Sequence, residues 1–596
     1  MNTIIIGRIN ALRQAMKSDG IDAVIIPQTD PHQSEYLADH WEARRWLSGF
    51  TGSAGSLVVT ADEALLWTDS RYFIQAAQQL DGSGIVLMKD GLTDTPSIED
   101  YLLSKLDKGT TVGIDGMMFS LTAATQMRSR LADGEITLNT CFAPIDSIWT
   151  DRPALPDDAV FIHEEKYAGE SATSKIGKAL ANAAKSGAEA VFISALDEIA
   201  WILNIRSSDV PCNPVATAFL YLSADRKVLF INESKIDSNV RDYLAEADVE
   251  TAPYDGVARF LTLLPAATKV LIEPARTADT LATILGNKAI TGRSTTAMLK
   301  AVKNETQING LRNAMERDGA ALVRLFIEIE RRLAAGEPTT ETDIEKLGRQ
   351  YRSMSPLYFD DSFGMIAGYG PHGAIVHYSA TPESASTLQP RGLLLVDSGA
   401  QYLDGTTDIT RTVALGTPTA QEKRDFTLVM KGHIALGSMI FPAGTRGDQL
   451  DAIARQYLWK NGLSYLHGTG HGVGHFLNVH EGPQSIRLNH VDIPLTPGMI
   501  TSNEPGVYRE GVHGIRCENL VLTVPAMTTE FGSFLKFETL TLFPFDRSLF
   551  DLDIMTDEEI RWVDNYHINV RTRLLPYMAT DTERAWLTSH TQPLAN

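Results

Sequence analysis

The first 300 residues carry one strand pattern twice. Short apolar runs typical of β-strands lie at 21–26, 57–62 and 111–115. Each has a counterpart about 160 residues further along the chain, at 188–193, 220–225 and 269–273. Helix-length segments separate the runs, and this alternation is typical of α/β domains. The pattern predicts two related α/β domains; the alternative is that two unrelated α/β domains look alike at this level.

The length of the chain implies further domains. A chain of 596 residues is longer than one hydrophobic core normally organises. A polar stretch with two prolines, at 151–158, is typical of a linker. We expect an N-terminal α/β domain over 1–152, a second, related α/β domain over 153–300, a third domain over 301–545 and a C-terminal extension over 546–596.

The third predicted domain begins with a long helix. Seven apolar residues recur there at helical spacing, namely Ile308, Leu311, Met315, Leu322, Phe326, Ile329 and Leu333. A second helix follows with Thr340 as its N-cap, and two more are expected over 419–438 and 447–460. Strand patterns separate the two helix pairs. This order predicts a curved antiparallel sheet backed by helices.

Five side chains with metal-binding potential lie where polar breaks interrupt the apolar strands of this domain. They are Asp397, Asp408, His471, Glu504 and Glu518. A hairpin through 403–405 would bring the two aspartates together, and the segment 506–514 would do the same for the two glutamates.

The chemistry of this set points to divalent cations. Four carboxylates and one neutral imidazole carry a formal charge of about −4, which two divalent cations would neutralise. An oxygen-rich site with one nitrogen suits hard or borderline cations better than thiolate-loving ones. Two adjacent cations can activate a water molecule for hydrolysis. A two-metal hydrolase is therefore the first functional hypothesis.

The net charge and the cysteines limit the partners and the compartment. A formal net charge of −21 argues against a nucleic-acid or anionic-membrane partner, because both need a basic surface. The three cysteines, Cys141, Cys212 and Cys517, are far apart and odd in number, which favours a reducing compartment. The first residues lack the features of a secretory signal, and no apolar run is long enough to span a membrane. We expect a cytoplasmic protein.

Several motifs resemble one family along nearly the whole chain. In the third domain they are DSGAQY at 397–402, GTTD at 405–408, HGTGHGVG at 467–474, NEPG at 503–506 and IRCEN at 515–519. In the front half they are PHQSEY at 31–36, GFTGSAG at 49–55, WTDSRYF at 67–73, LDEIAW at 196–201 and NPV at 213–215. These segments resemble the pita-bread metallopeptidases, and among them the Xaa-Pro aminopeptidases (aminopeptidase P) in their long, three-domain cytosolic form.

The resemblance implies a fold and a reaction. The fold would be two creatinase-N-like α/β domains followed by a pita-bread catalytic domain. The five side chains named above would hold two divalent metal ions, most often Mn²⁺, with Zn²⁺ or Co²⁺ as alternatives. A water or hydroxide bridging the metals would attack the Xaa-Pro bond and release the N-terminal residue from peptides with proline in second position. A homodimer is also implied.

The resemblance further implies catalytic roles for other residues. His377 would stabilise charge on the scissile carbonyl oxygen, while His467 and His480 would orient the substrate and assist proton transfer. Glu504 would also take a proton from the attacking water. Arg516 would either orient a ligating carboxylate, which we favour, or touch the substrate directly. His475 is close in sequence, but the family pattern does not require it, so we expect a wall residue.

Two other functions remain open. An Xaa-Pro dipeptidase (prolidase) shares the metal ligands but accepts only dipeptides, and a non-catalytic peptide-binding module can share the fold. Binding modules of this kind typically lose ligands, whereas all five are present here. The stretch 562–570 has near-helical spacing, and it would pack either on its own chain or against a second copy.

Overall fold

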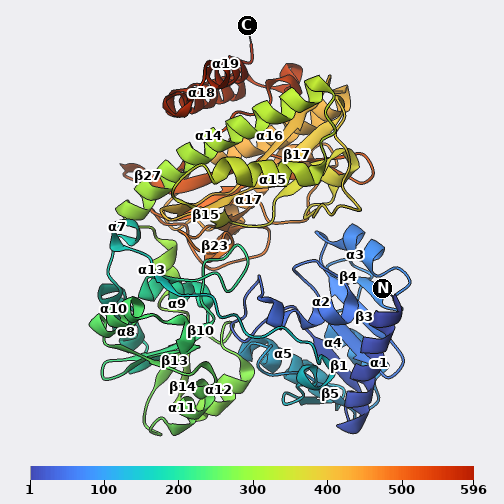
Figure 1. Ribbon diagram of the computed structural model, residues 1–596, viewed down its shortest axis with the longest axis vertical. Coiled ribbons are helices and arrows are strands. Elements are labelled where there is room, and N and C mark those ends of the chain that lie inside the picture. Colours follow the sequence, from blue (N-terminus) through green and yellow to red (C-terminus); the bar gives the residue numbers. More distant parts are fainter. Residues whose placement is uncertain (1, 596) are drawn as a thin grey trace. The chain divides into compact units, whose positions relative to one another are not determined.

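The computed structural model describes residues 2–595, and these form two compact units (Figure 1). The N-terminal unit contains the chain up to His163 together with Glu170–Thr296. The C-terminal unit contains Glu164–Gly169 and the chain from Ala297 onward. Each unit has its own buried hydrophobic core.

The N-terminal unit contains two six-stranded sheets with the same strand order. The first has the order β4-β3-β2-β1-β5-β6, with β1 (Ala23–Ile26), β2 (Ser56–Thr60), β3 (Ala64–Thr68), β4 (Val86–Lys89), β5 (Thr111–Gly113) and β6 (Thr137–Asn139). The second has the order β12-β11-β10-β8-β13-β14, with β8 (Ala190–Ile193), β10 (Ala218–Ser223), β11 (Lys227–Ile231), β12 (Val249–Ala252), β13 (Val270–Ile272) and β14 (Ala289–Thr291).

The strand directions also repeat between the two sheets. Strand β1 pairs antiparallel with β2 and parallel with β5, and β8 pairs in the same way with β10 and β13. All six predicted runs overlap these six strands. The predicted pair of related α/β domains is confirmed.

Helices cover both faces of these sheets, which explains why the strands are apolar on both sides. Along β1, Val24 and Ile26 enter one core while Ala23 and Ile25 enter the other, because successive side chains of a strand point to opposite faces. The helices of this unit include α1 (Asn2–Ser18), α4 (Ile98–Lys105), α5 (Leu121–Ala132), α8 (Ala172–Lys185), α9 (Leu196–Leu203), α10 (Ser238–Glu246), α11 (Val257–Leu263) and α12 (Asp279–Leu285).

The C-terminal unit contains the four predicted helices. They are α14 (Glu305–Ala335), α15 (Glu341–Arg352), α16 (Ala420–Gly437) and α17 (Gly447–Trp459). Asn304 and Gln307 form a capping box that starts α14, and Gly336 ends it in the left-handed conformation that glycine adopts without strain. Thr340 caps α15 as predicted, together with Asp343. Helix α14 packs on α15, and α16 packs on α17.

The strands of this unit form antiparallel sheets. Two three-stranded sheets have the orders β15-β18-β19 and β16-β17-β20, and a six-stranded sheet has the order β21-β28-β27-β24-β22-β23. The strands are β15 (Tyr358–Asp361), β16 (Ile366–Tyr369), β17 (Leu393–Ser398), β18 (Ala400–Tyr402), β19 (Gly405–Thr406), β20 (Ile409–Ala414), β21 (Ile440–Pro442), β22 (Gly470–Gly472), β23 (Glu481–Ile486), β24 (Ile500–Asn503), β27 (Asn519–Thr529) and β28 (Gly532–Thr539). Helices α14 and α16 share one core with these strands, as the helix-strand order predicts.

The C-terminal segment packs on its own chain. Helix α18 (Asp557–Leu574) buries Val563 and Val570 in the core of the C-terminal unit, and α19 (Asp581–His590) follows it. The Arg411 guanidinium donates a hydrogen bond of 2.9 Å to the Tyr566 hydroxyl. The stretch 562–570 therefore packs on its own chain, which is the first of the two alternatives given by its sequence pattern.

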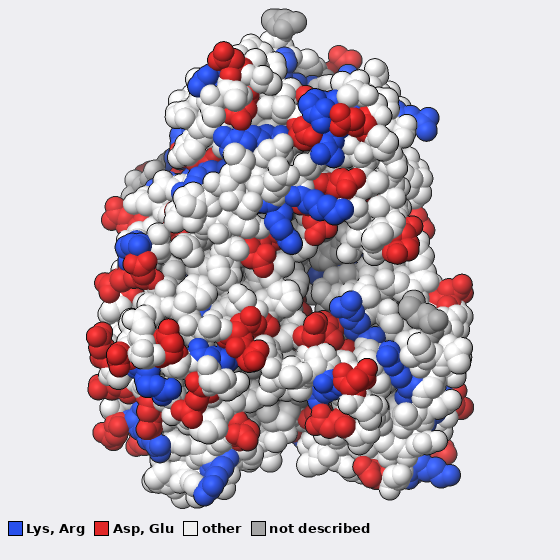
Figure 2. All heavy atoms as spheres, in the orientation of Figure 1, with Lys and Arg blue, Asp and Glu red and all other residues white. Residues whose placement is uncertain are grey.

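Acidic and basic side chains are interspersed on the face of the molecule that Figure 2 draws. Figure 2 shows acidic groups spread over the face drawn, with basic groups between them, and not one large basic patch. None of the helices in residues 2–595 is long and apolar enough to cross a membrane.

Two buried neutral histidines should make the C-terminal unit sensitive to acid. Burial, together with the nearby Arg411 charge, lowers the pKa of both His433 and His567 to about 3. Because their pKa in the unfolded chain is about 6.5, the unfolded state takes up protons first as the pH falls. Between about pH 6.5 and 3, each histidine should lower the free energy of unfolding by up to about 1.4 kcal/mol per pH unit.

Denaturant unfolding at pH 7, 6 and 5 measures this dependence. The double variant His433→Gln/His567→Gln should show a shallower loss of stability over that range than the wild type. An equal pH slope in both proteins would contradict the assignment of these histidines as buried and neutral.

Candidate metal centre

The first pair of acidic residues lies on the hairpin formed by β17 and β20. These strands pair antiparallel, with Asp397 opposite Thr410. Asp408 immediately precedes β20, after the short β18–β19 pairing. The hairpin predicted from the sequence therefore exists, and both aspartates lie at the same end of it.

The second pair follows the same plan. Glu504 comes directly after β24, and Glu518 directly before β27, and these two strands pair with Asn503 opposite Asn519. The hairpin of β25 (Gly506–Arg509) and β26 (His513–Arg516) connects the glutamates. Glu518 lies beside the first hairpin, because its backbone N–H donates to the Thr410 carbonyl and its side chain accepts from the Thr410 hydroxyl at 2.8 Å.

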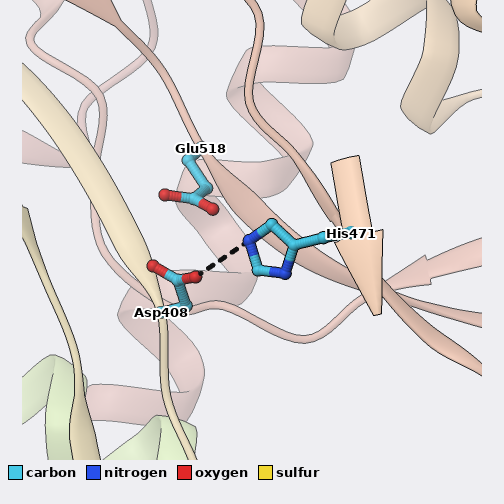
Figure 3. Close-up of side chains that lie close together, drawn as sticks. All are labelled: Asp408, His471 and Glu518. Carbon is cyan, nitrogen blue, oxygen red and sulfur yellow. Dashed lines mark ion pairs between the residues drawn. The ribbon is translucent and has the colours of Figure 1, made fainter. Parts of the chain in front are cut away.

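His471 joins the two acidic pairs. It lies in β22, which pairs with β24. Figure 3 shows its ring directed toward Asp408 and Glu518, and one ligand atom from each of these three residues lies within 4.8 Å of the other two. Its Nε2 is 3.4 Å from Asp408 Oδ2 and 3.5 Å from Glu504 Oε1. The structure therefore brings four of the five predicted ligands together around one imidazole nitrogen.

A backbone contact fixes the orientation of the His471 ring. Its Nδ1–H donates to the Gly472 carbonyl at 2.9 Å, which leaves Nε2 facing the carboxylates. This is the usual arrangement for a histidine that binds a metal through Nε2.

Asp397 reaches the cluster alongside Arg516. The Arg516 guanidinium donates to Asp397 Oδ2 through Nη2 at 2.6 Å and Nε at 3.2 Å. The other carboxylate oxygen, Oδ1, is buried and accepts no hydrogen bond from any described residue. A buried carboxylate oxygen without a donor is costly unless a cation lies beside it.

The charges of the cluster fit bound cations. Burial raises the pKa of Asp397, of Glu518 and of Glu504, whose pKa rises to about 7, and repulsion from the neighbouring Asp408 carboxylate adds to this effect. For His471, burial opposes protonation, but the Asp408 hydrogen bond and the Glu504 charge outweigh it and raise its pKa to about 9. The four carboxylates outnumber the positive charges of Arg516 and of a protonated His471, and hard or borderline divalent cations supply the missing positive charge.

The predicted catalytic histidines lie in three places. The His480 ring stands edge-on to the His471 ring, with their centroids 4.4 Å apart. His467 donates from Nδ1 to the Gly468 carbonyl, and its Nε2 accepts from the Tyr508 hydroxyl at 2.8 Å. His377 is half-buried in the loop before β17, and the preceding Val376 carbonyl accepts from Arg516 Nη2 at 3.3 Å. His475 is buried, and its Nε2 faces Gly310.

Tyr508 is a site residue that the sequence interpretation missed. Its hydroxyl accepts from Arg516 Nη1 at 2.8 Å while it donates to His467, and burial raises its pKa to about 12. The register of a short hairpin could have indicated Tyr508 from the sequence. In the β25–β26 hairpin Tyr508 is opposite Gly514, so Tyr508 and Arg516 are diagonal neighbours on one face.

Two acidic residues outside the metal cluster were also missed. Glu341 is fully buried beside the loop that carries His377, and Glu481 is buried next to His480. No local pattern in the sequence indicates the contacts of either residue, because their partners are far away along the chain.

Family signatures cover most of the chain. The signature of metallopeptidase family M24 matches residues 309–525, and that of the C-terminal region of peptidase M24 matches 533–594. Two creatinase/prolidase N-terminal domain signatures match residues 8–147 and 151–307.

Relatives align along the whole length. Aminopeptidase P2 of Arabidopsis thaliana is 41% identical over 97% of this chain and 86% of its own length. The probable Xaa-Pro aminopeptidase P of Coprinopsis cinerea is 41% identical over 98% of this chain and 97% of its own. The crystal structure of X-prolyl aminopeptidase from Caenorhabditis elegans, a cytosolic enzyme with a di-nuclear active site, has a TM-score of 0.96 at 34% identity and covers 99% of both chains. With these matches and a carboxylate-imidazole cluster in the matched region, the chain belongs to metallopeptidase family M24 and is related along its length to the Xaa-Pro aminopeptidases.

Proposed function

We propose that this protein is a metal-dependent aminopeptidase that releases the N-terminal residue from peptides with proline in second position. One observation carries the proposal. Asp408, His471 and Glu518 come from three separate segments, and their ligand atoms lie within 4.8 Å of one another. The chain around them aligns end to end with Xaa-Pro aminopeptidases.

Five side chains would hold two divalent cations. Asp397, Asp408, His471, Glu504 and Glu518 are the assigned ligands, and their oxygen-rich set favours Mn²⁺, with Zn²⁺ or Co²⁺ as alternatives. When bound, the cations would lower the pKa of water and polarise the scissile carbonyl. Arg516 would hold Asp397 in place, and the Gly472 carbonyl would hold the His471 ring.

The remaining site residues would handle the proton and the substrate. Glu504 would accept a proton from the attacking water and pass it to the leaving proline nitrogen. The hydrogen bond from Tyr508 keeps His467 Nε2 in a fixed direction. His480 and His377 are assigned to orient the substrate and to stabilise charge on the carbonyl oxygen.

The preference for proline has a chemical reason. An Xaa-Pro bond is a tertiary amide, so its nitrogen carries no hydrogen. A peptidase that recognises its substrate through the N–H of the scissile bond therefore cannot bind an Xaa-Pro bond in that way. A site that holds the free N-terminal amine against carboxylates, next to a pocket for the proline ring, does not need that hydrogen.

A pair of substrates tests the proposed function. Purified protein supplied with Mn²⁺ should release Xaa from Xaa-Pro-Pro-Yaa and leave Xaa-Ala-Pro-Yaa intact. Release of proline from an Xaa-Pro dipeptide without cleavage of the longer peptide would indicate a dipeptidase instead. Peptide binding without any cleavage would indicate a binding module.

The organisation and setting of the enzyme are part of the same proposal. We assign the two α/β domains to 1–152 and 153–300, the catalytic domain to 301–545 and the C-terminal extension to 546–596. A homodimer in the cytoplasm is proposed from the resemblance to the long cytosolic form and from the description of the Caenorhabditis elegans enzyme as cytosolic.

A further inference from the structure

The loop that carries His377 has no helix or strand of its own to hold it. It begins after the short 3₁₀ helix η5 (Gly370–Ala374), and β17 begins only at Leu393. A catalytic side chain must stay within about 0.5 Å of its productive position, and a long irregular loop needs outside support to achieve this.

The carboxylate of Glu341 provides such support. Glu341 is the first residue of α15 and is fully buried. Four groups in the segment 369–386 donate hydrogen bonds to its side chain. They are the Tyr369 N–H at 2.8 Å, His372 Nδ1 at 2.9 Å and, on the far side of His377, the Tyr378 hydroxyl at 2.9 Å and the Ser386 N–H at 2.7 Å. One carboxylate therefore holds the chain both before and after His377.

The position of Glu341 suits a charged acceptor. The backbone N–H groups at the N-terminus of α15 favour negative charge there. The Glu341 N–H itself donates to the Ser386 carbonyl at 3.2 Å, and Thr340 and Thr387 form a β-bridge beside it. The end of the loop is thus attached to the start of the helix by backbone as well as side chain.

A second contact ties the same loop to the metal cluster. The Val376 carbonyl, next to His377, accepts from Arg516, which also binds Asp397. Gly373 and Gly514 approach so closely that a Cβ on Gly514 would lie 1.7 Å from the Gly373 carbonyl oxygen. His377 is therefore carried by a segment that Glu341 anchors both before and after it in sequence, and that β26 contacts at Gly373 and Val376.

We propose that Glu341 is a positioning residue of the enzyme, which fixes the loop so that His377 faces the substrate. The inference rests on the proposed function, because it assigns Glu341 an effect on catalysis that acts through His377. Among the described residues, the hydrogen bonds of the Glu341 side chain go to Tyr369, His372, Tyr378 and Ser386, none of which is an assigned metal ligand. Loss of Glu341 should lower kcat and leave the bound metal in place.

Glu341→Gln is the sharpest substitution. Glutamine keeps the shape but replaces one acceptor oxygen by an NH₂ group, which would face a backbone N–H that cannot reverse its direction. We expect kcat to fall by about 10–100-fold, with KM changed by less than about threefold and metal content unchanged.

Glu559→Gln is the matched control. Glu559 is also a buried carboxylate in the first turn of a helix of this unit, and it accepts the Thr556 N–H at 2.8 Å and pairs with Lys431 at 2.5 Å. Its substitution should lower the melting temperature, as Glu341→Gln does, but leave kcat near the wild-type value. An equal loss of kcat in the control would overturn the inference, because general destabilisation would then explain both.

A double-mutant cycle with His377→Ala tests whether Glu341 acts through His377. In the His377→Ala background, Glu341→Gln should lower kcat by less than about threefold further, since the loop no longer carries the side chain it positions. A further loss as large as in the wild-type background would overturn the proposal.

Hydrogen exchange provides a readout that does not depend on activity. Amides in 369–388 should exchange faster in Glu341→Gln than in wild type, while those of Glu559→Gln in the same segment should not. Unchanged exchange in Glu341→Gln would overturn the proposal even if the protein cleaves no Xaa-Pro peptide. If the wild-type protein cleaves no Xaa-Pro peptide but the amides in 369–388 exchange faster in Glu341→Gln, the proposed function is rejected. The anchoring of the loop by Glu341 then still holds.

Discussion

Replacing Asp408 by alanine should abolish hydrolysis of an Xaa-Pro-Yaa peptide and leave both units folded. Asp408 is 3.4 Å from His471 Nε2 and is one of the three residues whose ligand atoms converge. Loss of one bridging or chelating carboxylate should weaken cation binding and remove the charge stabilisation that the cations supply, so kcat/KM should fall by at least about 10³-fold. Steady-state kinetics with saturating Mn²⁺ measure the loss of hydrolysis, and circular dichroism of the variant measures whether both units remain folded.

Asp404→Asn is the control for this substitution. Asp404 lies on the same hairpin and is also buried, but it pairs with Arg317 and not with the cluster. Its replacement should keep kcat/KM within about tenfold of the wild type while lowering stability. Near-normal turnover in Asp408→Ala, or an equal loss in Asp404→Asn, would show that the assigned residues are not the metal site.

Replacing Glu481 by glutamine should strongly destabilise the C-terminal unit. The carboxylate of Glu481 is buried between two lysines, with Lys303 Nζ 2.5 Å from Oε1 and Lys300 Nζ 2.6 Å from Oε2. The second contact is an ion pair and not a well-aligned hydrogen bond. Without the carboxylate, two buried ammonium groups lose the counter-charge that Glu481 supplies, and breaking a buried pair of this kind costs about 3–5 kcal/mol.

Thermal unfolding of the variant measures this effect. The midpoint should fall by about 5–8 °C, because each kcal/mol corresponds to about 1.6 °C in a unit of about 300 residues. The half-exposed pair of Glu538 with Arg312 provides the comparison, and Glu538→Gln should shift the midpoint much less. An unchanged midpoint in Glu481→Gln would mean that the lysines find other partners or release their protons.

The strands and the cluster of candidate ligands could be predicted from the sequence because both leave local patterns. Three strands of each α/β sheet are short apolar runs, and the duplicate of each run occurs at a nearly constant offset. Asp397, Asp408, Glu504 and Glu518 each interrupt an apolar run near a turn, and antiparallel pairing converts that spacing into proximity. His471 was found through its motif.

The supporting contacts could not be predicted, because they join residues that are distant in sequence. Glu341 meets Tyr378 and Ser386 across an irregular loop, and Glu481 meets two lysines that precede it by more than 170 positions. No periodicity connects such residues. Tyr508 is the exception, because its place opposite Gly514 in a short hairpin already puts it beside Arg516.

The number of cations bound per chain tests the central claim most directly. Protein stripped with a chelator should be inactive, and equilibrium dialysis against Mn²⁺ followed by elemental analysis should give two Mn²⁺ per chain, with Xaa-Pro cleavage returning as the ions bind. The Asp408→Ala variant should bind fewer than two under the same conditions. Full cleavage by the stripped protein, or two Mn²⁺ bound equally well after loss of Asp408, would contradict the account.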